Sequence, residues 1–193
     1  MATSKMYKTI GIIAEDKSDV EVIENILAKY VKRNQFSIKP WVGNGCGKLK
    51  NKCDIWTQIL FQRGCEHVLI FHDLDRNDEK KLRNLLLEKV PKAKYPKSVI
   101  VIPIEELEAW LLSDSAAIKT TFNLLKAPKK ISNCEAVASP KEELGRIVWA
   151  LGKKRYLNTV HNKIISQHTT LVNLRRCTSF GTFDDYVMDE IFA

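Results

Sequence analysis

Carboxylates gather at three points of the sequence, each directly after an apolar segment. The segments are residues 7–14, 67–72 and 98–103. The carboxylates that follow them are Glu15, Asp16 and Asp19, then Asp73, Asp75 and Asp78, then Glu105, Glu106 and Glu108. Like charges that share one edge of a sheet repel unless a cation neutralises them, and hard ions such as Mg²⁺ and Mn²⁺ prefer carboxylate oxygens. The pattern predicts a site for a divalent cation.

Hydrophobic periodicity predicts the elements that would bring these acids together. β-branched apolar runs predict strands at residues 7–14, 36–42, 67–72 and 98–103. Helical spacing predicts helices at residues 19–33, 50–63, 79–89 and 105–112. Strands that alternate with crossover helices form a parallel sheet covered on both faces, and such sheets bind ligands at the carboxyl ends of their strands. Pro40 favours an edge position for the second strand.

After Asp114 the pattern changes, because segments of helical period follow one another without a further strand. We therefore expect an α/β core over residues 1–115 and a basic helical extension over residues 116–193 that packs on the core. Ser18 or Asp19 is expected to cap the first helix. Asp16 and Asp78 are expected to be turn or cap residues rather than ligands.

The net charge of +8 arises from 31 basic and 23 acidic side chains, and residues 115–193 carry twelve Lys or Arg against seven Asp or Glu. A cationic surface favours a polyanionic partner, of which nucleic acid is the commonest. The alternative is a basic surface without such a partner. Lys153, Lys154 and Arg155, in the segment "LGKKRY", are the local candidates for contacts with a phosphate backbone.

The five cysteines are scattered and form no C-x-x-C pair, which indicates neither a zinc knuckle nor a disulfide framework. Reduced thiols favour a cytoplasmic location. The sequence has no apolar run of the ~18–20 residues that a membrane helix needs, and the segment "MATSKMYKTI" lacks the apolar centre of a signal peptide. We therefore expect no membrane association.

Two segments resemble the motifs of Toprim domains. "GIIAEDKSDVEVI" is similar to the first motif, a strand followed by a glutamate and by an aspartate four residues later. "LIFHDLDRND" is similar to the second motif, a D-x-D after a buried strand. "IPIEELEAWLLSD", "SPKEELGRIVWALGKKRY" and "LRRCTSFGTFDDYV" resemble a small stand-alone Toprim-like family, domain of unknown function 4276, over nearly the whole chain. The resemblance implies a Toprim-like (Rossmann-like) parallel sheet flanked by helices, with a C-terminal helical extension.

The resemblance also implies roles for individual residues. The candidate metal ligands are Glu15, Asp19, Asp73, Asp75, Glu105 and Glu108, with Glu106 left open as an alternative to the last two. Of these, Glu15, Asp73 and Asp75 are also the candidate catalytic residues. Lys163 is the fourth candidate catalytic residue, because it is similar in position to a basic residue that contacts the scissile phosphate.

Two classes of function follow from the resemblance. The first is a nuclease that hydrolyses DNA or RNA with two Mg²⁺ or Mn²⁺ ions, one held by Glu15, Asp19 and Asp73, the other by Asp75 with Glu105 or Glu108. Members of such families are often encoded beside an ATPase of the AAA or ABC kind, in apparent phage-defence pairs, so that a neighbouring ATPase is an expected partner. The second class is a non-catalytic Toprim-fold subunit that docks on this ATPase.

Several residues have a structural reading beside a functional one. The turn Gly43–Lys48 resembles a phosphate-binding loop but departs from G-x-x-x-x-G-K-[ST] at Val42 and Leu49, so we expect no ATP binding there. A turn that faces the substrate, with Lys48 in contact with nucleic acid, is expected instead. Trp110 is expected in the core. His72 either points into the site or packs in the core.

Overall fold

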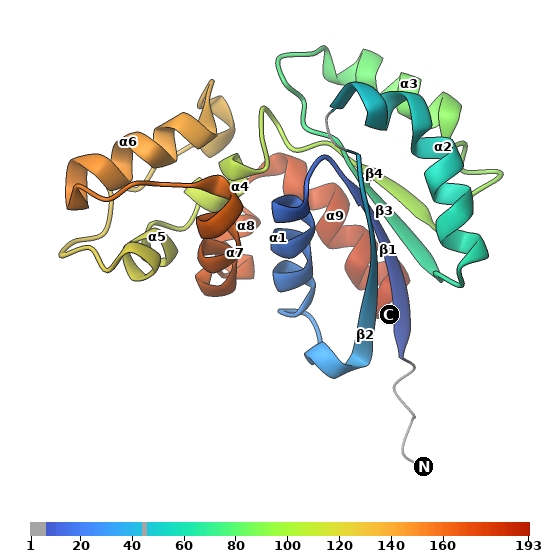
Figure 1. The fold of residues 1–193 in the computed structure, drawn as a ribbon, viewed down its shortest axis with the longest axis horizontal. Coiled ribbons are helices and arrows are strands. Elements are labelled where there is room, and N and C mark those ends of the chain that lie inside the picture. The colour runs from blue at the N-terminus through green and yellow to red at the C-terminus, as the bar shows by residue number, and fades with distance from the viewer. Residues whose placement is uncertain (1–6, 44–45) are drawn as a thin grey trace.

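A sheet of four parallel strands forms the centre of the molecule (Figure 1), seen in a computed structural model that describes residues 7–43 and 46–193. The strands are β1 (Lys8–Ala14), β2 (Phe36–Val42), β3 (His67–Phe71) and β4 (Ser98–Val101), in the order β2-β1-β3-β4. Pro40 lies on the edge strand β2 opposite Ile12, where a missing N–H does not interrupt a central ladder. The predicted parallel sheet and the edge position of the second strand are confirmed.

Alternating side chains along the strands give each face of the sheet its own hydrophobic core. Ile10 and Ile12 belong to the core that contains α1 (Lys17–Leu27) and the C-terminal helices. Ile13 belongs to the second core, which contains α2 (Cys46–Gln62) and α3 (Glu79–Lys89). The period-two alternation of β1 therefore decides which helices cover which face.

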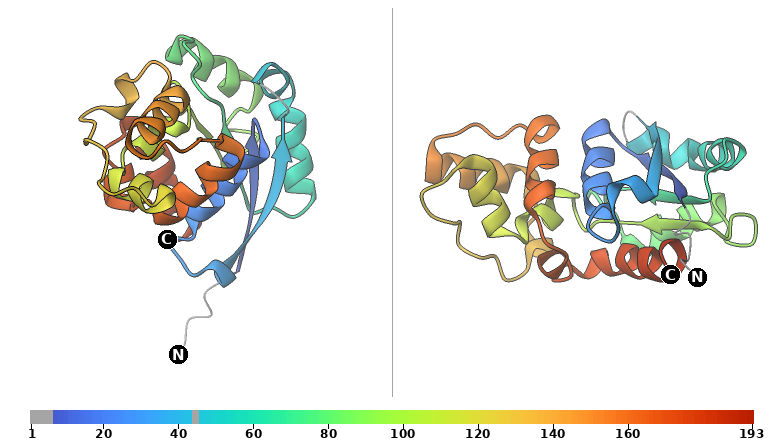
Figure 2. Two further views of the ribbon diagram at one scale, coloured as in Figure 1. Left: turned by 60° about the vertical axis from the view of Figure 1, so that its left-hand side comes forward. Right: turned by 90° about the horizontal axis from the view of Figure 1, so that it is seen from below.

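The remaining helices form a lobe beside the sheet and then return to it (Figures 1 and 2). They are α4 (Glu108–Leu112), α5 (Ser115–Phe122), α6 (Pro140–Gly152), α7 (Asn158–His168), α8 (Leu171–Leu174) and α9 (Gly181–Tyr186). Short 3₁₀ turns lie at Arg33–Gln35, Cys134–Ala136 and Thr178–Phe180, and a π-helical turn at Val187–Ile191 follows α9. Phe71 of β3 and Phe183 of α9 are in ring contact at 5.6 Å, so the sheet and the helical segment share one core.

The first helix begins and ends earlier than its periodicity predicts. Asp16 is its N-cap and accepts hydrogen bonds from the backbone N of Ser18 and Asp19, at 2.7 and 3.1 Å. The prediction of a cap at Ser18 or Asp19 is therefore wrong, and the expected capping role of Asp16 is confirmed. The helix ends at Leu27 because the chain turns there, and the Tyr30 hydroxyl donates to Asp184 Oδ1 at 2.5 Å.

Two other helix starts bear on the acidic residues. Asp78 caps α3 by accepting from Lys81 N at 2.8 Å, as expected. The helix predicted from residue 105 begins only at Glu108. The reason is local, because Glu105 has a φ of 60°, a left-handed conformation that a right-handed helix cannot contain.

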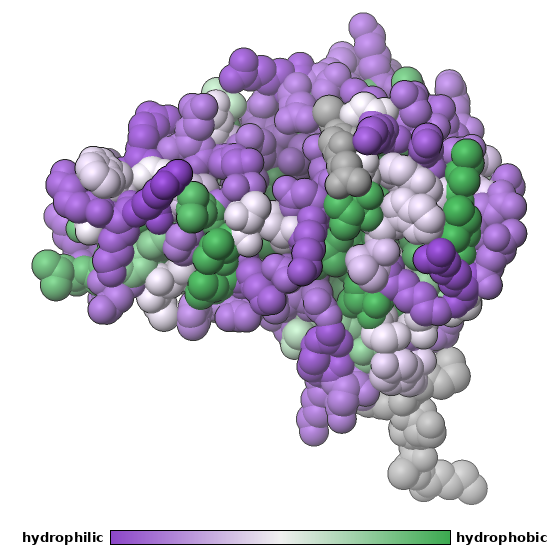
Figure 3. All heavy atoms as spheres, viewed as in Figure 1, coloured by the Kyte–Doolittle hydropathy of each residue, from purple (hydrophilic) through white to green (hydrophobic). Residues whose placement is uncertain are grey.

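Most of the surface shown in Figure 3 is hydrophilic, with separate hydrophobic patches. Within the described residues no helix has both the length and the apolar character needed to cross a membrane. Cys53, Cys65, Cys134 and Cys177 are buried free thiols.

Candidate functional site

Glu15 and Asp73 lie where the connections of the sheet diverge. The chain leaves β1 toward β2 on one side, whereas β3 pairs with β1 on the other side. The crevice outside the carboxyl ends of two such strands is the topological switch point, at which open α/β sheets bind their ligands. Glu15 directly follows β1, and Asp73 is the second residue after β3. The sheet order thus brings acids from two distant segments to the usual ligand position.

Three carboxylates line one small cavity at this point. Glu15, Asp19 and Asp73 form its polar walls, and Phe71 and Leu107 form its apolar walls. Its volume is about 10 Å³, which is the room that a single water or small ion requires. We call this space the acidic cavity. Its three acids are the set that the sequence predicts for one ion.

Only some of the carboxylate oxygens around the acidic cavity accept hydrogen bonds. Asp19 Oδ2 accepts from Asp16 N at 3.2 Å, and Asp73 Oδ1 accepts from Leu107 N at 3.1 Å. Glu15 Oε1 is buried and has no hydrogen-bond partner among the described residues. A buried carboxylate oxygen without a donor is costly, so this atom marks the place where a cationic or donating ligand would be stabilising.

Electrostatics at the acidic cavity favours protonated acids as long as no cation is bound. Burial, followed by repulsion from Asp75 and Asp16, raises the pKa of Glu15 to about 7. Burial and repulsion from neighbouring acids also raise the pKa values of Asp19 and Asp73 well above their usual range. Desolvation and like charges disfavour the ionised forms, so a bound cation would have a large effect on all three acids.

The donor set at the acidic cavity fits a hard divalent ion. As the side chains are placed, however, residues 7–43 and 46–193 contain no group of three or more His, Cys, Asp or Glu that could hold a metal ion. The chemistry is nevertheless suitable, because all three groups are carboxylates and one buried oxygen of Glu15 is without a partner. The metal site predicted from the sequence therefore stays a prediction.

A second, larger cavity is lined by the other candidate ligands except Glu108. Its lining includes Asp75, Glu105, Glu106 and Lys141, and its volume is about 290 Å³. Asp75 N donates to Glu105 O at 3.1 Å, and both residues have positive φ, 49° and 60°. Residues other than glycine adopt this conformation uncommonly, and strained backbone of this kind is enriched at functional sites. We call this space the outer cavity.

Comparison with known proteins places most of the chain in one family. The family model described as Domain of unknown function (DUF4276) matches residues 14–187. The chain belongs to this family. The membership predicted from the sequence is confirmed, and the DUF4276 match includes the strands β2, β3 and β4 and the helical lobe. No curated protein and no solved structure matches the chain.

The three glutamates of the DUF4276 segment "EELE" make different contacts. Glu105 and Glu106 both line the outer cavity. Glu106 Oε2 accepts from Lys141 N at 2.9 Å, where the first turn of α6 offers unpaired N–H groups and a positive dipole end. Glu108 is buried, and its Oε1 accepts from Asn162 Nδ2 at 2.9 Å. Asn162 in turn accepts at Oδ1 from the Tyr156 hydroxyl at 2.5 Å, so a polar chain links Glu108 to the helical lobe.

The basic residues predicted from the sequence lie apart from one another. Lys163 Nζ forms an ion pair with Glu21 of α1 at 3.2 Å. Lys48 is exposed in the first turn of α2; part of the Gly43–Lys48 turn, residues 44–45, lies outside the described residues. Lys153, Lys154 and Arg155 follow α6, and Lys154 Nζ donates to Phe122 O at 2.6 Å. His72 is buried, with Nδ1 at 2.6 Å from Asp73 O.

Sequence reasoning missed two lysines near the acids. The charges of Lys50 and Lys141 both lower the pKa of Glu15. Lys50 Nζ lies 3.5 Å from Asn77 Oδ1, in the loop that carries Asp75, and Lys141 lines the outer cavity. No local pattern indicates either residue, because each lies on a helix far from the acidic motifs in sequence.

The raised pKa of Glu15 predicts how stability responds to pH in the absence of metal. The folded chain binds this proton more tightly than the unfolded chain, so the stabilisation is complete below about pH 4.5 and is lost as the pH rises through about 7. His67, whose pKa burial lowers to about 4, acts in the opposite direction between about pH 4 and 6.5. Both wild type and Glu15→Gln contain His67, so the contribution of His67 cancels when their free energies of unfolding are subtracted.

We expect Glu15→Gln to gain stability relative to wild type by about 1–2 kcal/mol between pH 5 and pH 8, after allowance for partial solvent screening. Urea unfolding in EDTA at several pH values measures this difference. A difference that stays constant over the whole range would contradict the electrostatic account of the acidic cavity.

Proposed function

We propose that the chain is a metal-dependent nuclease that hydrolyses phosphodiester bonds of DNA or RNA with Mg²⁺ or Mn²⁺. The observation that carries this proposal is the acidic cavity, in which Glu15, Asp19 and Asp73 meet at the switch point of the sheet. A Toprim relationship is part of the proposal. It is supported by a glutamate after β1, an acid four residues later on α1 and the D-x-D after β3.

Two sets of residues would hold the ions. Glu15, Asp19 and Asp73 would hold one, and Asp75 with Glu105 or Glu108 would hold the other. The shared outer cavity and the backbone hydrogen bond between Asp75 and Glu105 support Glu105 over Glu108. When bound, Mg²⁺ or Mn²⁺ neutralises charge on the scissile phosphate and favours ionisation of the attacking water.

The chain's own residues supply position and charge. Leu107 N fixes one oxygen of Asp73 and so orients the other toward the ligand. Lys50 and Lys141 approach the acids from α2 and α6, and their ammonium groups would contact the non-bridging oxygens of the phosphate. We assign the phosphate contact to these two lysines rather than to Lys163, which is paired with Glu21.

A cleavage assay tests this proposal. Purified chain with Mg²⁺ or Mn²⁺ is expected to cleave at least one of four substrates, single- or double-stranded DNA or RNA, and EDTA is expected to stop the reaction. Lys50→Ala with Lys141→Ala should reduce the rate by about 10–100-fold, because charge stabilisation at the phosphate is lost. Lys94→Ala with Lys97→Ala is the matched control, since these exposed lysines precede β4 at the opposite edge of the sheet. An equal rate in both double variants would contradict the assignment.

A second candidate function is a non-catalytic subunit that docks on an ATPase of the AAA or ABC kind. One observation favours it: as the side chains are placed, the described residues contain no group of three or more potential metal ligands. The same assay separates the two candidates when it is repeated with an ATPase of this kind, if one is encoded beside the chain. Absence of cleavage with either metal, with and without the ATPase, would favour the subunit. A role in phage defence belongs to either candidate as a proposal.

A further inference from the structure

Most of the excess positive charge of the chain lies in one segment of the helical lobe. Residues 119–155 contain nine Lys or Arg and three Asp or Glu, whereas the rest of the chain contains 22 against 20. The acids in this segment are partly engaged by neighbours. Glu135 accepts hydrogen bonds from Thr178 N and Ser179 N, and Glu143 forms an ion pair with Arg146. With a net charge of +6, out of +8 for the whole chain, the segment gives this part of the lobe a basic surface.

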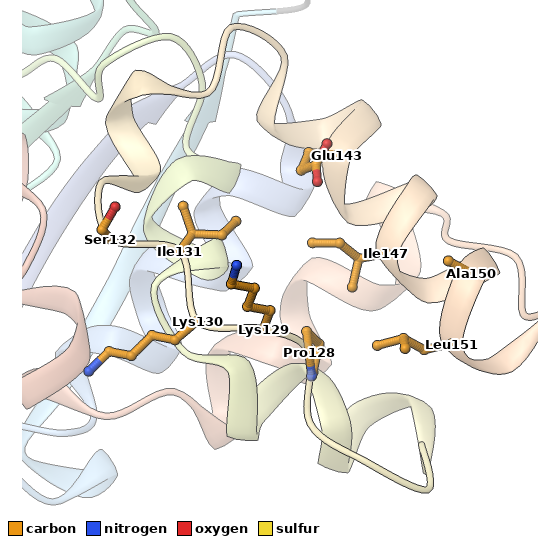
Figure 4. Close-up of a pocket in the computed structure, with 9 residues that line it drawn as sticks. All are labelled: Pro128, Lys129, Lys130, Ile131, Ser132, Glu143, Ile147, Ala150 and Leu151. Atoms are coloured by element: carbon orange, nitrogen blue, oxygen red, sulfur yellow. The ribbon is translucent and has the colours of Figure 1, made fainter.

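This surface contains the hollow shown in Figure 4. The hollow lies between α6 and residues 128–132 and has a volume of about 510 Å³. Ile131, Ile147 and Leu151 give it apolar walls, and Glu143 lies at one end. Lys129 and Lys130 also line it, and both are exposed without a hydrogen bond or ion pair to any described residue. An apolar space with free cations beside it suits a ligand that combines flat rings with negative charge.

A more exposed side of α6 carries a tryptophan between two cations. Arg146 and Trp149 are spaced i, i+3 and so lie on one face of the helix, and Lys153 is the C-cap residue that directly follows it. Trp149 is 58% exposed, and Lys153 Nζ lies 5.6 Å from the centre of its ring. A large exposed aromatic side chain among cations is the arrangement on which unpaired bases stack.

We infer that the hollow, together with Arg146 and Trp149 of α6 and the C-cap residue Lys153, binds single-stranded nucleic acid. Bases would contact Trp149 and the apolar walls, and phosphates would contact Lys129, Lys130 and Lys153. The inference rests on the proposed nuclease function, because it identifies the surface that holds the substrate strand. α6 begins at the outer cavity and extends ~20 Å along the hollow. A strand lying on α6 would therefore lead into the acidic residues. A duplex keeps its bases paired and cannot offer their faces to Trp149.

Fluorescence anisotropy in EDTA, which prevents cleavage, tests this binding. The probes are labelled single-stranded DNA and RNA of mixed sequence, about 16 nucleotides long, with the matching duplexes for comparison. Trp149→Ala is expected to weaken single-strand binding by about 5–100-fold, and Trp149→Phe should keep most of it. Lys129→Ala with Lys130→Ala should flatten the slope of log affinity against log salt by about 1.4. Lys94→Ala with Lys97→Ala should leave the slope unchanged.

Two outcomes would overturn the inference. The first is a wild-type chain that binds duplex more tightly than single strands, or binds neither, which would leave the hollow to a protein partner. The second is equal single-strand affinity of Trp149→Ala and wild type. The two readouts separate this inference from the nuclease proposal, because binding is measured in EDTA and cleavage is measured in Mg²⁺ or Mn²⁺. Binding that depends on Trp149 without any cleavage in Mg²⁺ or Mn²⁺ would refute the nuclease and retain the surface.

Discussion

Glu15→Gln is expected to lower metal-dependent cleavage by at least about 100-fold while the chain stays folded. The amide keeps the size of the side chain but removes its negative charge. Among the described residues, Glu15 and Asp54 are the two acids with a buried oxygen that has no hydrogen-bond partner. Because the carboxylate of Glu15 is repelled by Asp75 and Asp16, its loss relieves repulsion in the metal-free protein. Activity and stability should thus change in opposite directions, which a simple folding defect would not produce.

The matched control for Glu15→Gln is Glu21→Gln. Glu21 lies close to Glu15 in sequence, on α1, but it forms a surface ion pair with Lys163. Exposed pairs of this kind contribute ~0–1 kcal/mol to stability. Cleavage rate and thermal midpoint should be measured on one preparation of each variant, with and without Mn²⁺. We expect Mn²⁺ to raise the midpoint of wild type and of Glu21→Gln, and to raise that of Glu15→Gln much less. Wild-type cleavage by Glu15→Gln would exclude the proposed mechanism.

Trp110→Ala is expected to destabilise the fold by about 3–5 kcal/mol, the usual cost of truncating a large buried aromatic side chain. Trp110 is fully buried, and its Nε1 donates to Ser179 Oγ at 2.8 Å. Its ring centre lies 5.0 Å from that of Phe180 and 6.0 Å from that of Phe71. The side chain therefore joins α4 to β3 and to the C-terminal segment, so its removal leaves a cavity between three elements.

Two further variants serve as comparisons for the loss of stability in Trp110→Ala. Trp110→Phe keeps an aromatic ring but removes the hydrogen bond to Ser179, at a cost of about 1 kcal/mol or somewhat more. Trp149→Ala makes the same truncation at a tryptophan that is 58% exposed, where substitutions away from buried features change stability by about 0.5 kcal/mol or less. Urea unfolding measures all three. A loss at Trp110 no larger than that at Trp149 would contradict the core role that the structure gives to Trp110.

Local pattern was sufficient to predict the sheet and the acids that follow its strands. The strand 36–42 was predicted at its observed bounds, and the helix 79–89 likewise, because both depend on short-range periodicity and on a nearby cap. The convergence of Glu15 and Asp73 followed from the rule that parallel strands end at one edge. Trp110 was predicted in the core and is buried there.

Tertiary contacts decided what the sequence could not predict. In the segment "EELE", single-residue steps through a positive-φ turn send Glu105 to the outer cavity, Glu106 to the start of α6 and Glu108 to Asn162. Periodicity alone predicts one continuous helix there. Lys50 and Lys141 were missed for a related reason, since their proximity to Glu15 depends on how α2 and α6 pack.

The segment between β4 and α4 also has a mechanical consequence. Glu105 O accepts from Asp75 N, Glu106 Oε2 accepts from Lys141 N, and Leu107 N donates to Asp73 Oδ1. Three successive residues thus fasten both aspartates of the D-x-D and the first turn of α6 to one short piece of backbone. α6 extends about 20 Å from this attachment point. A change in the tilt of α6 would therefore act, through these three hydrogen bonds, on the positions of Asp73 and Asp75.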